Sequence, residues 1–117
     1  MMNKSVLLLL LAIAATEVAA ALPADCSVTD ANGVRRVMQP NGELLAAQCY
    51  QCHGDQGRSL GEIDSIGGKS AGDLYGDLRE FKSNGKADIM SLQARAYRDC
   101  ELYAIAQYLS TLPNQGD

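Results

Sequence analysis

Residues 49–53 read CYQCH, and this pentapeptide limits what the chain can fold around more than any other feature. It places two cysteines two residues apart, with the chain's one histidine directly after the second. Four kinds of site are compatible with this arrangement of cysteines and histidine: a covalently attached haem, half of a zinc site, a dithiol redox pair and a structural disulfide. The compartment and the flanking segments decide between them.

The first residues indicate export from the cytoplasm. Lys4 precedes an apolar run over residues 6–15, and small residues follow it, which is typical of a secretory signal peptide. Glu17 interrupts the run well before the roughly 20 apolar residues that a membrane span needs. We therefore predict a signal peptide over residues 1–24, a periplasmic location and no stable membrane insertion.

The mature chain is small and poor in aromatic residues. Removing residues 1–24 from the 117 leaves 93, enough for one domain that needs a disulfide, metal or cofactor to complete its core. The sequence has no Trp and one Phe, and a large planar cofactor would compensate for that. Its net charge of −4 disfavours nucleic-acid binding, which needs concentrated Lys and Arg.

The segments around the motif favour helix. Residues 25–40 are expected to form an amino-terminal extension of irregular or short extended structure, and residues 41–117 the folded domain. Asn41 is a good helix N-cap, so the first predicted helix runs directly into the cysteine motif. The glycine-rich stretch that follows, over residues 54–72, predicts a loop with a tight backbone path.

Three further helices are predicted after this loop. One begins at the Ser70 cap and ends at Gly85, the next begins near Asp88, and the last runs from Asp99 to a stop before Pro113. No stretch alternates long enough to organise a sheet. The expected fold class is all-α.

The haem interpretation explains every letter of the motif. Two thiols two residues apart can add to the vinyl groups of one porphyrin, and the next residue is then placed to bind the iron. Zinc is disfavoured because Cys26 and Cys100 stand at the wrong separations for a paired site. A redox dithiol would start a helix after a strand, and a disulfide leaves His53 unexplained.

With His53 on one face of the iron, no second histidine remains for the other face. A methionine thioether is the natural sixth ligand, and Met38 and Met90 lie outside the signal segment. Met90 is favoured because a loop and a helix separate it from the motif, which is enough chain to pass around the ring. An open sixth position is the remaining alternative.

The stretch from Asn41 to Leu112 resembles the class I c-type cytochromes. The likeness rests on a helix entering CYQCHG, a glycine-rich loop, a middle helix, an axial methionine and a closing helix with ELYAIAQYLSTL. Within the class it is most similar to the cytochrome subunit of flavocytochrome c sulfide dehydrogenases, through CHGDQGRSLG, LREFKSNGKADIM and QARAYRDCELYAIAQYL.

This resemblance implies a small class I cytochrome c fold, with helices wrapped around one covalent haem c. It implies that Cys49 and Cys52 attach the haem, that His53 and Met90 ligate the iron, and that no residue is catalytic. An FAD-containing sulfide dehydrogenase subunit would donate electrons, and a soluble acceptor would receive them. Two alternatives stay open: a free carrier serving a terminal oxidase or another periplasmic enzyme, and a haem sensor with an open iron site.

The family's usual proline after the motif is missing from GEIDSIGG. A backbone carbonyl there can still accept a bond from the histidine ring. Leu60, Ile63, Ile66, Leu74 and Leu78 are expected to bury the porphyrin. Cys26 and Cys100 remain, and in an oxidising compartment they could pair with each other, stay as two thiols or form an intermolecular bridge.

Overall fold

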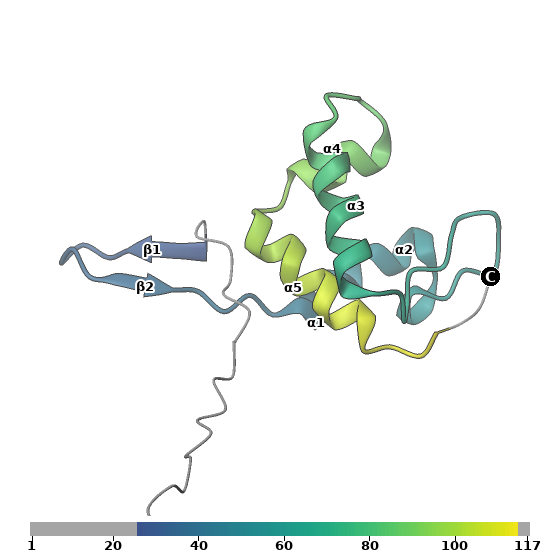
Figure 1. Cartoon of the computed structure of the whole chain (residues 1–117), viewed down its shortest axis with the longest axis horizontal. Coiled ribbons are helices and arrows are strands. Elements are labelled where there is room, and N and C mark those ends of the chain that lie inside the picture. Colours follow the sequence, from purple (N-terminus) through teal and green to yellow (C-terminus); the bar gives the residue numbers. More distant parts are fainter. Residues whose placement is uncertain (1–25, 115–117) are drawn as a thin grey trace, which may run out of the picture.

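The computed structural model describes residues 26–114, so the predicted signal peptide over residues 1–24 lies outside the described residues. Figure 1 shows a helical body with a hairpin projecting from one side. The mostly helical fold predicted from the sequence is confirmed. Within the described part of the chain, no helix is both long and apolar enough to span a bilayer.

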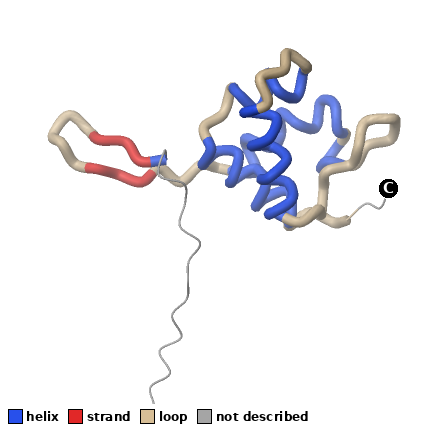
Figure 2. Tube along the Cα trace, turned by 45° about the horizontal axis from the view of Figure 1, so that its top comes forward, coloured by secondary structure: helices blue, strands red, loops and turns tan. Residues whose placement is uncertain are grey.

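The hairpin forms from the extension that precedes the first helix. Strands β1 (Ser27–Thr29) and β2 (Arg35–Val37) pair antiparallel, with Ser27 opposite Val37. Asp30 fixes the turn because its carboxylate accepts bonds from the Asn32 and Val34 amides. Figure 2 shows the same hairpin standing clear of the helices. The sequence indicated only irregular or short extended structure here.

A continuous helical run leads into the cysteine motif. It consists of α1 (Gly42–Ala46), the 3₁₀ turn η3 (Ala47–Cys49) and α2 (Tyr50–His53). The run begins where the side chain of Asn41 accepts a bond from the Leu44 amide at 3.1 Å, as the cap predicts. It ends at Gly54, whose φ of 83° is in the range that favours glycine.

Beyond the short turn η4 (Asp55–Gly57) and the glycine-rich loop, the remaining helices close the body. These are α3 (Ala71–Ser83), α4 (Ile89–Arg95) and α5 (Asp99–Ser110). The caps follow the sequence: the Ser70 hydroxyl accepts from the Asp73 amide, and the Asp88 carboxylate accepts from the Ser91 amide. α3 lies against both α4 and α5.

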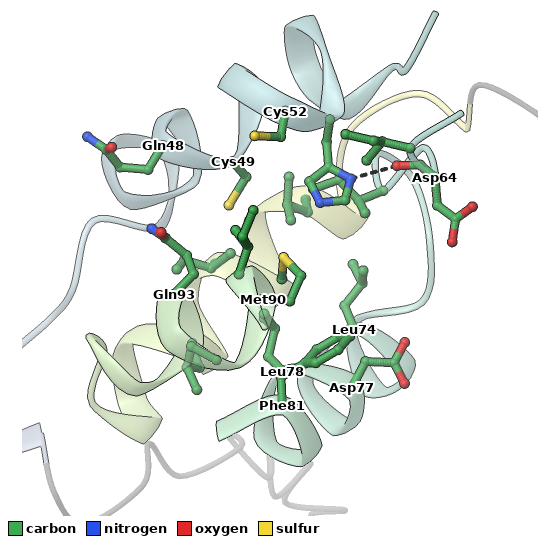
Figure 3. Close-up of a pocket in the computed structure, with 18 of the residues that line it drawn as sticks. Gln48, Cys49, Cys52, Asp64, Leu74, Asp77, Leu78, Phe81, Met90 and Gln93 are labelled. Carbon is green, nitrogen blue, oxygen red and sulfur yellow. Dashed lines mark hydrogen bonds between the residues drawn. The ribbon is translucent and has the colours of Figure 1, made fainter. Parts of the chain in front are cut away.

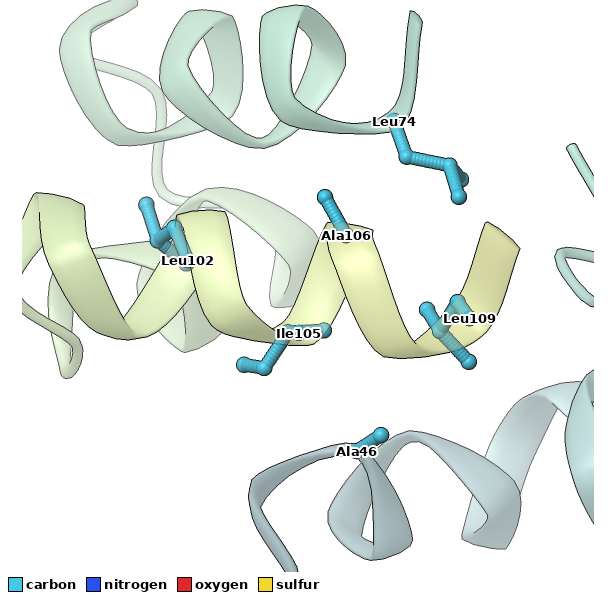
Figure 4. Close-up of a cluster of buried hydrophobic side chains, with 6 residues drawn as sticks. All are labelled: Ala46, Leu74, Leu102, Ile105, Ala106 and Leu109. Atoms are coloured by element: carbon cyan, nitrogen blue, oxygen red, sulfur yellow. The ribbon is translucent and has the colours of Figure 1, made fainter. Parts of the chain in front are cut away.

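The core forms along α5, which crosses between α1 and α3. Figure 4 shows α5 side chains facing Ala46 of α1 on one side and Leu74 of α3 on the other. The fully buried members of this cluster come mainly from α5: Leu102, Ile105, Ala106 and Leu109. Gly42 lets α1 approach closely, because a Cβ there would collide with the carbonyl of Ala104.

Candidate haem site

The helical run over residues 42–53 brings the motif to one wall of a cavity. Residues three apart on a helix lie on the same face, so Cys49 and Cys52 are neighbours there, and His53 follows at the end of the helix. Figure 3 shows both sulfurs on the side of this wall that faces Met90. Neither thiol is in a disulfide.

The cavity has a volume of about 720 Å³, inside the range of sites that hold a small molecule or cofactor. Its lining includes both motif cysteines, His53 and Met90. The apolar part of the lining comes from the loop, α3 and α5, and includes Ile63, Ile66, Leu74, Leu78, Phe81, Leu102, Ile105 and Leu109. A cavity with a largely apolar lining and two thiols at its wall fits a covalently attached porphyrin.

The imidazole of His53 is oriented by the loop. Its Nδ1 lies 2.6 Å from the backbone oxygen of Asp64, and this bond is the dashed line in Figure 3. A carbonyl has no proton to give, so Nδ1 must donate and Nε2 keeps its lone pair. An imidazole held in this way is prepared for metal ligation through Nε2. The carbonyl contact expected from GEIDSIGG is therefore present.

The glycine-rich loop is held in place without a proline. The Gly57 carbonyl accepts bonds from the Ile66 amide at 2.8 Å and the Gly67 amide at 3.1 Å, which closes the loop at its base. The Gly68 amide then donates to the Leu109 carbonyl at 2.8 Å. These bonds tie the segment that carries Asp64 to the end of α5, so the backbone acceptor of His53 has a fixed position.

Met90 reaches the cavity from α4, on the wall that faces the motif. Met38, the other candidate, lies just beyond β2, is 50% exposed and does not line the cavity. Of the two methionines, the structure brings only Met90 to the same cavity as His53.

One residue expected around the porphyrin lies elsewhere. Leu60 is 92% exposed and does not line the cavity, so its assignment was wrong. It stands at the outer part of the loop, where the close turn at Gly57 directs the chain away from the body before Ile66 returns. Phe81 was not singled out for the cavity, although it continues the stripe of Leu74 and Leu78 at helical spacing.

The environment of Cys49 disfavours a redox thiolate. Burial raises the pKa of the Cys49 thiol, whereas a reactive redox thiol needs a lowered pKa. Within residues 26–114 no group of three or more His, Cys, Asp or Glu side chains could hold a metal ion.

Cys26 and Cys100 are buried together away from the motif, with Cα atoms 5.4 Å apart.

Comparison with known proteins finds similarity to small cytochromes, in agreement with the geometry of the cavity. The chain is 35% identical over 80 residues to the cytochrome subunit of sulfide dehydrogenase from Chlorobaculum tepidum, covering 68% of this chain and 73% of that protein. It is 34% identical over 79 residues to cytochrome c-553 from Helicobacter pylori, covering 65% and 82%. Cytochrome c-553 from Nitratidesulfovibrio vulgaris is 30% identical over 86 residues, with coverage of 68% and 84%. No protein-family model matches the chain.

Proposed function

Since this chain belongs to the class I c-type cytochromes, we propose that Cys49 and Cys52 attach its one haem c and that His53 and Met90 ligate the iron. The observation that best supports this proposal is that all four side chains line one cavity. The His53 ring in it is oriented by its hydrogen bond to the backbone oxygen of Asp64. The chain is an electron-transfer protein and is not itself a catalytic enzyme.

The haem, when bound, supplies one-electron chemistry between ferrous and ferric iron. The protein's part is to hold the ligands and exclude water. A methionine sulfur favours the softer ferrous ion, and the apolar wall from α3 and α5 disfavours the extra charge of the ferric site, so both raise the reduction potential.

We propose that the electron donor is a flavoprotein sulfide dehydrogenase. The similarity to a cytochrome subunit of sulfide dehydrogenase supports this assignment. A free soluble carrier is the second candidate, supported by the two relatives named cytochrome c-553. A sensor with an open iron position is disfavoured, because Met90 already occupies the wall across the cavity from the motif.

Two further assignments belong to the same proposal. The protein acts in the periplasm after loss of a signal peptide over residues 1–24, with residues 25–40 as an extension and residues 41–117 as the cytochrome domain. In that oxidising compartment Cys26 and Cys100 form a disulfide, which their geometry permits.

The donor is tested by purifying the protein from the periplasm of its native cells under mild conditions. Each fraction is assayed for covalent haem and for flavin, and sulfide-dependent reduction of the haem is followed by absorbance. Co-elution of haem with flavin and sulfide-dependent reduction is expected. A haem protein that elutes alone and is not reduced by sulfide with any flavin fraction would contradict the donor assignment.

Attachment is tested separately in a host that exports the chain and couples haem. After denaturation, acidified organic solvent should leave the colour with the polypeptide. A Cys49→Ser/Cys52→Ser variant provides the control, since any haem that it binds should pass into the solvent. Extraction of the haem from the wild-type chain would rule out covalent attachment.

A further inference from the structure

We propose that Ser91 is a positioning residue for Met90. Its buried hydroxyl joins the end of α3 to the start of α4 and so holds the methionine thioether at the cavity. This inference rests on the proposed role of Met90 as an iron ligand, and it concerns a residue that neither the motif nor the cavity lining identifies.

The contacts of Ser91 converge on the short connection between the two helices. Ser91 has 0% of its surface exposed. Its hydroxyl lies 3.0 Å from Oδ1 of Asn84, at the end of α3, and 2.9 Å from Oδ2 of Asp88, which caps the start of α4. Both oxygens are acceptors, so the single hydroxyl proton is shared between them. Its backbone amide donates to the other oxygen of Asp88 at 2.9 Å. One residue therefore contacts both helix ends.

The connection itself is fixed through the same groups. Asn84 Oδ1 also accepts from the Lys86 amide at 2.9 Å, and the Lys86 carbonyl accepts from the guanidinium of Arg95. Gly85 supplies the left-handed turn, with a φ of 72°. The chain from Asn84 to Asp88 is thus folded back onto α4, immediately before Met90.

Other forces give α4 limited support. It has seven residues, and an isolated helix of that length is unstable in water. α4 packs against α3, but Ile89 is 77% exposed and Leu92 is 54% exposed, and Ile89 lies at the cavity, so more than half of the surface of each of these two residues is not packed against the described part of the chain. Ala94 is buried but is small. The hydrogen bonds at the first turn of α4 are therefore important for holding the helix in its position.

Loss of the hydroxyl would remove the one donor that Asn84 and Asp88 share and would loosen the first turn of α4, where Met90 lies. A thioether is a weak ligand, and it stays on a ferric iron only if the chain holds it there. The expected result is more frequent release of Met90, with Cys49, Cys52 and His53 unaffected because they stand on a different helix.

The test replaces Ser91 by Ala in the holoprotein. Ser110→Ala is the matched control, since Ser110 Oγ also donates one helix-end bond, to the Gln107 carbonyl at 2.7 Å, but at the far end of α5. The readouts are the weak near-red absorption of methionine-ligated ferric haem and the rate at which cyanide displaces that ligand. For Ser91→Ala we expect weaker absorption and roughly tenfold faster displacement, the scale of one lost buried bond. Ser110→Ala should match the wild type.

Asn84→Ala removes the α3 partner of Ser91 and the acceptor of the Lys86 amide, and it leaves Ser91 in place. It should also accelerate displacement, and the double variant should be less than additive because both changes break the same bond. If Ser91→Ala does not fold, Asn84→Ala alone decides. A wild-type displacement rate in either folded variant overturns the role of Ser91. Rapid displacement and no near-red absorption in the wild type would instead overturn Met90 as ligand.

Discussion

At the scale of single residues, the two methionines give a matched pair of substitutions. Met90→Ala removes the thioether from the cavity, so ferrous protein should bind carbon monoxide at neutral pH and ferric protein should lose its near-red absorption completely. Met38→Ala changes the same residue type beside the hairpin, where the side chain is 50% exposed, and should do neither. Carbon monoxide difference spectra distinguish the two. Binding by Met38→Ala and none by Met90→Ala would reverse the ligand assignment.

Tyr50 lies at the start of α2, within the CYQCH motif. Burial of its hydroxyl, with the Tyr108 phenol beside it, raises the pKa of Tyr50 to about 12. An unfolded tyrosine ionises near pH 10. The contribution of the neutral Tyr50 side chain to the free energy of unfolding is therefore fully present below pH about 10, and it is lost as the pH rises through about 12. Among residues 26–114 this buried hydroxyl has no hydrogen-bond partner.

Tyr50→Phe should therefore reduce the loss of stability between these two pH values and leave stability at pH 7 unchanged or slightly higher. The measurement is chemical unfolding, followed by circular dichroism, at a series of pH values. Tyr103→Phe is the control, since Tyr103 packs edge-on against Tyr75. The same alkaline loss in Tyr50→Phe and wild type would show that this phenol does not control it.

At the scale of elements, the crossing of α1 and α5 depends on Gly42. Gly42→Ala places a methyl group against the Ala104 carbonyl, so we expect a loss of about 1–3 kcal/mol, the usual cost of overpacking. Gly76→Ala is the matched control in α3, where a Cβ meets no atom, and should stabilise the protein by about 0.5–1 kcal/mol. Denaturant titration measures both. Equal stability of the two variants would mean that α1 can move away from α5 at little cost.

The sequence predicted the elements whose signals are local. Asn41 and Ser70 mark helix starts because a side-chain oxygen next to free amides is a local arrangement. For residues 25–40 the sequence predicted only irregular or short extended structure, because three-residue strands are too short to show clear alternation. Leu60 was misplaced because apolar spacing within a loop does not determine which way the backbone turns.

Parts of the site could not be predicted for a different reason. The acceptor of His53 is the backbone oxygen of Asp64, and every residue has such an oxygen, so residue type carries no signal. Ser91 looks like an ordinary first-turn serine, and its role depends on Asn84 being brought to it by the turn at Gly85. The motif itself was predictable because covalent attachment and iron ligation require particular side chains at fixed spacing.

At the scale of the whole molecule, the Cys26–Cys100 pair joins the hairpin to the first turn of α5. The two residues are 74 apart in sequence, and closing so long a loop in the unfolded chain should stabilise the protein by about 4 kcal/mol on a chain-entropy model. An isolated two-stranded hairpin is marginally stable in water. The Met38 amide donates to the Cys26 carbonyl at 2.8 Å within the hairpin, so the proposed Cys26–Cys100 disulfide would be the bond that anchors the extension to the body.

The last prediction compares the wild type with Cys26→Ala/Cys100→Ala, both with ferrous haem so that a reductant does not alter the iron. Without dithiothreitol the variant should unfold at lower denaturant, by an amount near 4 kcal/mol. With dithiothreitol under unfolding conditions the wild type should fall toward the variant, and the variant should not change, because the thioethers that hold the haem are not reduced. If the wild type is insensitive to the reductant and as stable as the variant, the two cysteines contribute only as buried thiols, and the proposed disulfide is ruled out.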